Sequence, residues 1–357
     1  MSQSPDSPVA VISQPMPGDA TAPTVFTLRR DGVEVQVTDA GASLYRVRTP
    51  DGQGGIDDIV CAPRQAEHFV ANPAYMGATI GRFANRIAGA RITVNGTAYP
   101  LTVNEGPNQL HGGECWHRHR WEAAITEHAT DPSVKFSYRS PAGEGGFPGT
   151  VSAHVRYTLK ARGELQIAFF AESDAPTVVN MTNHAYFNLN GAYYQGLRGQ
   201  HAQLFASRMT ETGAGNLPTG RILEVAGTPF DLRRPLDLAA VLDDLPDALK
   251  ETRGYDHNFV YKTENTQQIV DMAQISSQVT GRTLRISSSQ PGMQFYTGNF
   301  MGGQPGPEPG RTYDNYQAFC CEPQHFPDTP NQPDFPQCNV TPEQPYRQTI
   351  VYRFGTL

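Results

Sequence analysis

Short stretches of apolar and polar positions, broken by turn residues, run along most of the chain. Val151 to Leu159 and Leu165 to Phe170 are clear examples of strand-like segments. Asp31-Gly32, Asp51-Gly52, Asn95-Gly96 and Ala161-Arg162-Gly163 have the composition of hairpins or turns. The pattern therefore predicts many strands joined by short connections.

Helical spacing is scarce. Leu236 to Lys250 has some helical apolar periodicity, but Pro246 interrupts it. With 34 glycines and 29 prolines, long helices would be broken too often to form. No repeat of fixed period of the kind found in propellers or solenoids is present. We predict an all-β protein with few short helices.

The chain divides into a short N-terminal segment and one long unit. Its 357 residues would by themselves suggest two domains, but from Val25 onward no second linker interrupts the strands. Residues 1–24 are rich in Pro, Ser, Ala and Asp and offer little apolar surface to offset the entropy of ordering. We expect a mobile tail over residues 1–24 and a single domain over residues 25–357.

Charge and cysteine content narrow the class of protein. A net charge of −7 leaves no broad basic field for nucleic acid or anionic lipid, so neither is an expected partner. The five cysteines are odd in number, and Cys320 and Cys321 are adjacent, which favours a reducing compartment over a disulfide framework. No apolar run is long enough to span a membrane, and the first residues lack the regions of a signal peptide. The cytoplasm is the expected location.

Polar side chains gather among glycines and aromatic residues in segments that a hydrophobic core does not need. Sugar-binding sites have this composition, because amide, carboxylate and imidazole groups bind hydroxyls while aromatic rings cover C–H faces. The segments are GRFANRI (81–87), NQLHGG (108–113), NMTNHAYFNLNG (180–191), GYDHNF (254–259), PGMQFYTGNF (291–300) and CEPQHFPDTPNQPDFP (321–336).

In this order the six segments resemble those of the aldose 1-epimerase, or galactose mutarotase, family, from about Phe26 to Phe354. The connecting pieces Leu217 to Leu232 and Pro345 to Phe354 are similar as well. The resemblance implies a β-supersandwich of large antiparallel sheets with an open sugar cleft across one of them. It implies an isomerase that interconverts the α and β anomers of a free aldose such as galactose or glucose, without a cofactor or metal. The sugar is the expected partner, and the chain is expected to be a monomer or homodimer.

By resemblance, His184 in TNHAYFNL is the catalytic acid and Glu322 in CEPQHF the catalytic base. Mutarotation requires a base for the anomeric hydroxyl proton and an acid for the ring oxygen. Imidazole titrates near neutral pH, and partial burial tunes a carboxylate upward, so the two side chains suit this chemistry. Their roles exchange when the ring closes.

The resemblance also assigns substrate-binding residues. Arg86 and His111 match positions that bind sugar hydroxyls, Asn85 lies beside them, and Asp256 and Gln294 would exchange hydrogen bonds with further hydroxyls. Structural alternatives remain open: Arg86 could pair with an acidic neighbour, Asp256 could cap a turn, and Asn85 could satisfy backbone groups.

One segment departs from the family pattern. After LHGG the family usually continues with a Gly-Phe-Asp-like turn, whereas this chain has ECWHRHRW, Glu114 to Trp121. We expect this difference to affect substrate preference more than reaction type. His117 and His119 have the spacing of a metal-ligand pair on a strand, but no third ligand is evident from the sequence.

Three other functions stay open at the level of sequence. A sugar-phosphate 1-epimerase would need a cationic pocket, which Arg233-Arg234 or Arg118 and Arg120 could supply. A non-catalytic carbohydrate-binding module would need the cleft but not the acid/base pair. A metal-dependent enzyme could use His111, His184 and Glu322 as a two-histidine, one-carboxylate site.

Overall fold

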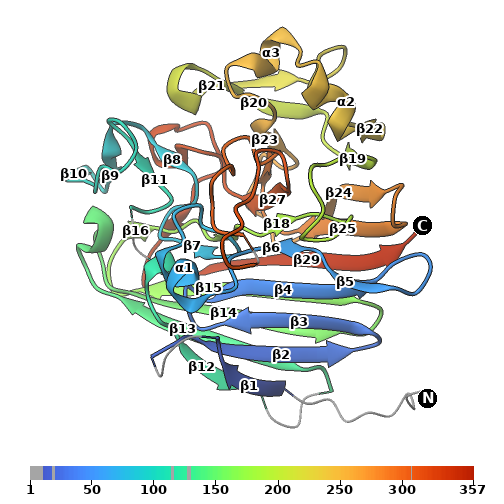
Figure 1. Ribbon diagram of the computed structural model, residues 1–357. Coiled ribbons are helices and arrows are strands. Elements are labelled where there is room, and N and C mark those ends of the chain that lie inside the picture. Colours follow the sequence, from blue (N-terminus) through green and yellow to red (C-terminus); the bar gives the residue numbers. More distant parts are fainter. Residues whose placement is uncertain (1–10, 18–20, 114–115, 127–129, 307) are drawn as a thin grey trace.

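The protein consists of large antiparallel β-sheets with few, short helices, which confirms the predicted all-β class (Figure 1). The computed structural model describes residues 11–17, 21–113, 116–126, 130–306 and 308–357. Three sheets of five, seven and nine strands account for most of the fold.

The nine-stranded sheet is the largest sheet described, and its strands follow the order β12-β13-β14-β15-β29-β25-β24-β19-β22. Along β14, buried residues alternate with more exposed ones, so one face meets the core and the other faces outward. The predicted turn at Ala161–Gly163 joins β14 to β15. The strands are β12 (Glu122–Ile125), β13 (Ser133–Ser140), β14 (Val151–Lys160), β15 (Glu164–Ser173), β19 (Gln200–Leu204), β22 (Leu236–Asp237), β24 (Val270–Ser277), β25 (Arg282–Ser288) and β29 (Tyr346–Thr356).

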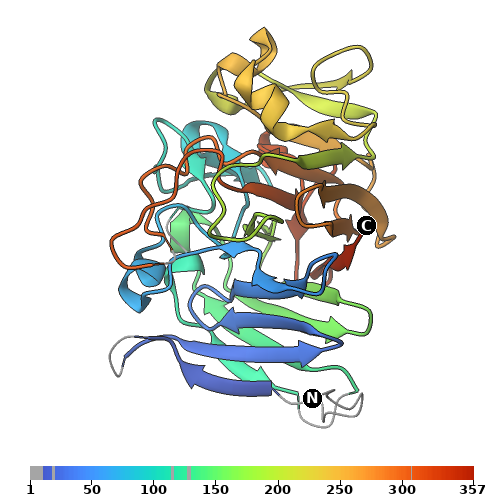
Figure 2. The same ribbon diagram turned by 45° about the vertical axis from the view of Figure 1, so that its right-hand side comes forward.

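The five-stranded sheet, in the order β1-β2-β3-β4-β5, packs on the first strands of the nine-stranded sheet (Figure 2). The Phe26 and Phe136 rings meet edge to face across this interface at 5.6 Å between centroids. The predicted turns at Asp31-Gly32 and Asp51-Gly52 follow β2 and β4. The strands are β1 (Val11–Pro15), β2 (Thr24–Arg30), β3 (Val33–Thr38), β4 (Ser43–Pro50) and β5 (Ile56–Asp58).

The seven-stranded sheet, in the order β21-β20-β23-β26-β27-β18-β6, packs on the remaining strands of the nine-stranded sheet. Phe187 contacts Tyr352 at 5.2 Å between ring centroids, and the Tyr352 hydroxyl donates to the Cys321 carbonyl at 3.4 Å. Its strands are β6 (Val60–Cys61), β18 (Tyr186–Phe187), β20 (Arg208–Thr212), β21 (Pro218–Glu224), β23 (Asp256–Val260), β26 (Gly292–Tyr296) and β27 (Phe319–Gln324).

Four two-stranded sheets and the helices complete the described fold. The small sheets pair β7 (Thr79–Ile80) with β17 (Thr182–Asn183), β8 (Arg86–Ile87) with β11 (Gln109–Leu110), β9 (Arg91–Val94) with β10 (Thr97–Pro100), and β16 (Thr177–Val178) with β28 (Asn339–Val340). The helices are α1 (Ala66–Ala71), α2 (Leu238–Asp243) and α3 (Asp247–Lys250), with short 3-10 turns η1 (Ala88–Ala90), η2 (Trp116–Arg118), η3 (Glu144–Gly146), η4 (Ala214–Asn216) and η5 (Thr329–Asn331).

Leu236 to Lys250 begins with the two residues of β22 and continues as two short helices, α2 and α3, where the sequence predicted only a helical periodicity interrupted at Pro246. The Asp237 carboxylate caps α2 by accepting a hydrogen bond from the Ala239 amide at 3.0 Å. Pro246 separates the helices and stands at the N-cap of α3. Across the described residues no helix is long and apolar enough to cross a membrane.

The predicted tail over residues 1–24 is wrong for Val11–Pro15. These residues form β1, which pairs with β2 in register from Val11 opposite Leu28 to Pro15 opposite Thr24. Four of the five side chains are exposed, so the segment is held by hydrogen bonds to the edge of the sheet and its composition gave no signal. Residues 1–10 and 18–20 of the expected tail lie outside the described residues.

Candidate active site

A cleft of about 440 Å³ brings together all seven residues singled out from the sequence, Asn85, Arg86, His111, His184, Asp256, Gln294 and Glu322. They come from three sheets or their connections: the seven-stranded sheet and the small sheets β8–β11 and β7–β17. Side chains that the sequence did not single out complete the lining: Tyr75, Glu105, Leu110, Tyr186, Asn216, Tyr296, Phe300 and Gln304, with Pro73 and Ala74.

Strand alternation separates the site from the core on the seven-stranded sheet. Gln294 on β26 lies directly opposite Glu322 on β27, so the two side chains share a face. Their neighbours Phe295 and Cys321 point the other way and belong to the main hydrophobic cluster. The same two-residue period therefore builds the cleft floor on one face and the core on the other.

His184 lies between two very short strands, β17 and β18, and its backbone is hydrogen-bonded to a neighbouring segment of the chain. Its amide donates to the Ala78 carbonyl at 2.9 Å, and its own carbonyl accepts from the Gly77 amide at 2.8 Å. The Asn183 side chain donates to the Gly77 carbonyl at 2.7 Å and to the Tyr157 hydroxyl at 3.1 Å. The backbone of Gly77 and Ala78 and the buried side-chain amide of Asn183 therefore fix the position of the imidazole.

His184 and Glu322 form a buried pair facing the cleft. His184 Nε2 lies 3.6 Å from Glu322 Oε2, and the residues are 5% and 2% exposed. Among the described residues Glu322 Oε2 has no hydrogen-bond partner, which is costly for a buried carboxyl unless a ligand supplies one. His184 Nδ1 lies 3.7 Å from the Cys320 sulfur.

Burial favours the neutral form of both members of the pair. It lowers the pKa of His184 to about 4. It raises the pKa of Glu322 well above its usual range; the neighbouring Asp256 carboxyl adds to this rise, and the Arg86 guanidinium opposes it. Burial therefore favours a proton on the Glu322 carboxyl and a free lone pair on the His184 imidazole.

Arg86 and Asp256 each have a polar partner within the cleft. Arg86 makes a bidentate ion pair with Glu105, with both nitrogen-to-oxygen distances at 2.7 Å. Burial disfavours its charge, but the Asp256, Glu105 and Glu322 carboxyls together hold the pKa of Arg86 above its usual value. Asp256 accepts a hydrogen bond from Gln294 Nε2 at 2.7 Å, and burial raises its pKa although Arg86 opposes this.

His111 sits in a turn whose residues 111, 112 and 113 all have positive φ. A Cβ at Gly112 would lie 2.3 Å from the Gly81 carbonyl oxygen, so glycine is needed for this close approach. The Asn85 amide donates to His111 Nδ1 at 3.2 Å. The neutral imidazole must then carry its proton on Nε2 and act there as a donor.

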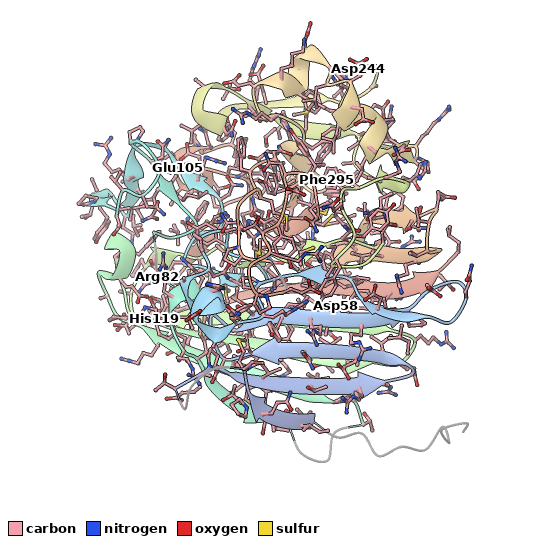
Figure 3. The ribbon with its side chains drawn as sticks, in the orientation of Figure 1. Asp58, Arg82, Glu105, His119, Asp244 and Phe295 are labelled. Atoms are coloured by element: carbon pink, nitrogen blue, oxygen red, sulfur yellow. The ribbon has the colours of Figure 1, made fainter. Side chains whose placement is uncertain are left out.

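Arg86 and Asn85 make the structural contacts that the sequence left open for them, and both residues still line the cleft. Arg86 does pair with an acidic neighbour, Glu105, which lies in the segment at the left of Figure 3. The Asn85 side chain accepts from the Arg86 amide at 2.8 Å, and Asn85 has a positive φ. Asp256 is the first residue of β23, and its carboxyl binds Gln294.

The spacing of His117 and His119 does not create a metal site among the described residues. His117 is buried against Tyr75, at 4.6 Å between ring centroids. His119 faces outward and pairs with Glu144 at 3.1 Å. Of the departing segment, Glu114 and Cys115 lie outside the described residues.

Within the described part of the chain, the one group of three metal-type ligands is His111, His184 and Glu322, whose ligand atoms lie within 4.8 Å of one another. A metal would need a free lone pair on His111 Nε2, since Nδ1 is occupied by the Asn85 amide. The hydrogen bond from Asn85 places the proton on Nε2, which suits a sugar oxygen better than a cation.

The arginines proposed for a phosphate pocket lie outside the cleft lining. Arg233 pairs with Asp231, and Arg120 pairs with Asp39. Arg86 is the one cationic side chain in the lining, and Glu105 neutralises it. The described cleft therefore has no surplus positive charge for a phosphate.

Known proteins match the chain along almost its whole length. The sequence model of the family described as Aldose 1-epimerase matches residues 24–353. A galactose mutarotase from Rattus norvegicus is 36% identical over 341 residues, which are 95% of this chain and 96% of that protein. An aldose 1-epimerase from Escherichia coli is 35% identical over 337 residues, 92% of this chain and 94% of that protein.

The fold agrees with these sequence matches. The crystal structure of a GalM/aldose epimerase homologue from C. elegans superposes with a TM-score of 0.84 at 30% identity. The alignment covers 94% of this chain and 100% of that one. The chain belongs to the aldose 1-epimerase family and is an isomerase.

Proposed function

We propose that the cleft opens and recloses the ring of a free aldose such as galactose, with His184 and Glu322 exchanging protons with the sugar. In the opening step the Glu322 carboxylate takes the proton of the anomeric hydroxyl. The bond between the anomeric carbon and the ring oxygen breaks, and the ring oxygen takes its electron pair together with a proton from His184. The product is the open-chain aldehyde.

Rotation about the bond between C1 and C2 exposes the other face of the aldehyde. On closure the protonated Glu322 returns a proton to the carbonyl oxygen while His184 takes one from the attacking hydroxyl. The pair ends as it began, so both anomers can enter the cycle. Microscopic reversibility requires this exchange of roles.

The single shared proton of the pair supports this cycle. The proton can lie on Glu322, with His184 neutral, or on His184, with Glu322 ionised. The pair has the same net charge in both arrangements. The 3.6 Å separation lets either arrangement form with a small movement or through a sugar hydroxyl between them. We infer that sugar oxygens, as hydrogen-bond donors and acceptors, shift the proton to His184 before the ring opens.

The remaining polar groups orient the ring. In this proposal His111 Nε2 and Arg86 donate hydrogen bonds to sugar oxygens. Asp256 accepts hydrogen bonds from sugar hydroxyls, and Gln294 donates to Asp256. Gln294 Oε1 is buried without a partner, so it is available to a substrate hydroxyl. Holding the ring against the acid and base is how such groups lower the barrier.

The observation that carries the proposal is the buried, unpartnered Glu322 Oε2 beside His184 within a cleft of hydroxyl-binding groups. Polarimetry of α-galactose tests it. The wild-type chain is expected to accelerate the change in rotation, and Glu322→Gln and His184→Asn each to slow it by about 10²–10⁴-fold, the usual contribution of a positioned acid or base. Both variants should still bind galactose.

The same experiment separates the alternatives. Full activity in either variant contradicts the assigned mechanism. Binding without acceleration by the wild type indicates a carbohydrate-binding module, and acceleration of a phosphorylated sugar alone indicates a sugar-phosphate epimerase. Activity lost to a chelator and restored by a divalent ion indicates the metal-dependent hypothesis built on His111, His184 and Glu322.

A further inference from the structure

Tyr75 forms one wall of the cleft and packs on the catalytic machinery. Its ring centroid lies 4.7 Å from that of His111 and 6.1 Å from that of His184, with the latter rings nearly parallel at 26°. The side chain is half-buried and lines the cleft.

The loop that carries Tyr75 is tied to the backbone of His184. Tyr75 has a φ of 58°, in the left-handed region that an aromatic residue rarely adopts. The Ala78 amide donates to the Tyr75 carbonyl at 3.0 Å, and Gly77 and Ala78 in turn bind the backbone of His184. The orientation of the Tyr75 wall and the position of the imidazole are therefore set by one hydrogen-bonded unit.

His117 supports Tyr75 from behind. Its ring lies 4.6 Å from that of Tyr75 at an angle of 66°, and His117 is buried and does not line the cleft. Trp116 anchors this segment: it is fully buried, and its ring occupies the space that a Cβ at Gly81 would need, 2.0 Å away. His117 thus belongs to a rigid segment that departs from the family pattern, yet it touches a wall of the site.

Epimeric aldoses differ in which ring face presents an unbroken row of C–H groups, and hexoses differ from pentoses in carrying an exocyclic CH₂OH group on the pyranose ring. An aromatic wall favours the sugar whose apolar face matches its position, whereas polar groups alone read only hydroxyls. We propose that Tyr75 is a specificity-determining residue that packs against a C–H face of the aldose, and that His117 is a positioning residue acting through it. This inference rests on the proposed function of the cleft.

Kinetics with galactose, glucose, xylose and arabinose test the proposal. Tyr75→Ala is expected to raise KM for the preferred sugar about three- to tenfold, the value of one aromatic contact, with a smaller fall in kcat. The kcat/KM ratios among the four sugars should change by about threefold or more. Tyr75→Phe should retain the wild-type order, because the ring remains.

Variants of the two histidines distinguish positioning from general destabilisation. His117→Ala should alter preference among the same sugars as Tyr75→Ala but by less, and His117→Phe should restore it. His119→Ala is the matched control, since His119 lies two residues along the same segment and pairs with Glu144 instead. An equal loss for all four sugars, or equal effects of His117→Ala and His119→Ala, would overturn the proposal.

Equilibrium binding in the Glu322→Gln background separates this inference from the proposed function. Sugar preference in binding needs no turnover, so Tyr75→Ala should still change it there. A wild type without mutarotase activity whose binding preference depends on Tyr75 would contradict the proposed function alone. An active wild type whose preference is indifferent to Tyr75 would contradict this inference alone.

Discussion

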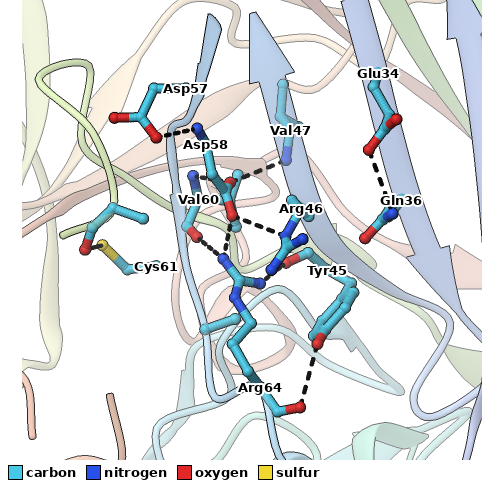
Figure 4. Close-up of polar contacts among 12 residues, drawn as sticks. Glu34, Gln36, Tyr45, Arg46, Val47, Asp57, Asp58, Val60, Cys61 and Arg64 are labelled. Carbon is cyan, nitrogen blue, oxygen red and sulfur yellow. Dashed lines mark hydrogen bonds and ion pairs between the residues drawn. The ribbon is translucent and has the colours of Figure 1, made fainter. Parts of the chain in front are cut away.

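Two of the buried carboxyl groups in this protein, those of Asp58 and Glu322, have very different surroundings. Asp58, at the end of β5, accepts hydrogen bonds from the Val60 and Val47 amides at 3.0 and 3.3 Å (Figure 4). Its other oxygen pairs with the Arg64 guanidinium and lies 3.0 Å from Arg46 Nε. Glu322, which is equally buried, has one oxygen without any hydrogen-bond partner.

The charges around the two groups follow the same division. Burial raises the pKa of both carboxyls, but at Asp58 two guanidinium groups, those of Arg64 and Arg46, oppose the rise. At Glu322 a second carboxyl, Asp256, adds to the rise and Arg86 alone opposes it. Arg86 is also shared with Glu105.

The protein leaves a buried carboxyl oxygen without a hydrogen-bond partner in the cleft but not at the junction between sheets. Asp58 and Arg64 join β4 of the five-stranded sheet to β6 of the seven-stranded sheet, and their hydrogen bonds are needed for that junction. Under the proposed function, Glu322 lies where the substrate binds and protons are exchanged, so a ligand would supply its missing partner. On this proposal the satisfied carboxyl stabilises the fold, and the unsatisfied one serves the reaction.

The largest expected difference is in catalysis. Glu322→Gln should lower kcat for mutarotation by about 10²–10⁴-fold, because the amide cannot take the anomeric proton. Asp58→Asn should leave kcat per folded molecule near the wild-type value, since Asp58 does not line the cleft. Polarimetry on samples whose folded fraction is known from circular dichroism checks both; equal losses would remove the distinction.

Stability should respond in the opposite order. Asp58→Asn leaves the buried Arg64 charge without its counter-ion and should lower the free energy of unfolding by about 3–5 kcal/mol. Glu322→Gln should cost less than about 1 kcal/mol or stabilise the fold, because it removes an unsatisfied buried carboxyl. Urea denaturation of the three proteins measures the difference. A larger loss for Glu322→Gln would contradict the comparison.

The stability effect of Glu322→Gln should depend on pH. The folded chain holds the Glu322 proton more tightly than the unfolded chain, because burial raises its pKa well above the ordinary value of 4.5. As pH rises through 4.5 the unfolded chain releases this proton first, so wild type loses stability up to the folded pKa. Glutamine has no proton to release. Denaturation across pH should show the variant gaining relative to wild type above 4.5 and no such gain at lower pH.

The smallest expected effect concerns a single arginine at Asp58. Arg46 has a 30% exposed side chain, and Arg64 still pairs with Asp58 when Arg46 is removed. Arg46→Met should therefore lower the free energy of unfolding by only about 1 kcal/mol, with unchanged mutarotase activity. Thermal unfolding and polarimetry provide the check. A loss as large as that of Asp58→Asn would show that Arg46 is the main partner.

Local pattern predicted much of the fold. The turns at Asp31-Gly32 and Ala161–Gly163, the strands they join, and the interruption at Pro246 all follow from side-chain preferences within a few residues. Val11–Pro15 was missed because an edge strand with exposed side chains is held by its neighbour's backbone and leaves no pattern of its own. The single domain, the cytoplasmic location and the oligomeric state remain predictions.

The site shows the same boundary. Chemistry indicated that a histidine and a carboxylate were suitable, but only the resemblance to a family selected His184 and Glu322 from the other polar residues. Tyr75 and Glu105 lie outside the segments singled out, and nothing local marks them. Arg82 and Arg86 stand in one motif, yet Arg82 is fully buried on Ser140 and the Pro148 carbonyl whereas Arg86 reaches the cleft.

The sequence by itself determined that short strands would alternate buried and outward side chains. The pairing of β26 with β27 then placed Gln294 and Glu322 on one face. The sequence could not determine which buried carboxyl would find partners. Asp58 meets Arg64 through a turn of the nearby chain, while Glu322 meets His184, Arg86 and Asp256 only when distant strands come together. Burial and charge at a site are sums over such long-range contacts, so the tertiary structure alone decided which carboxyl stabilises and which reacts.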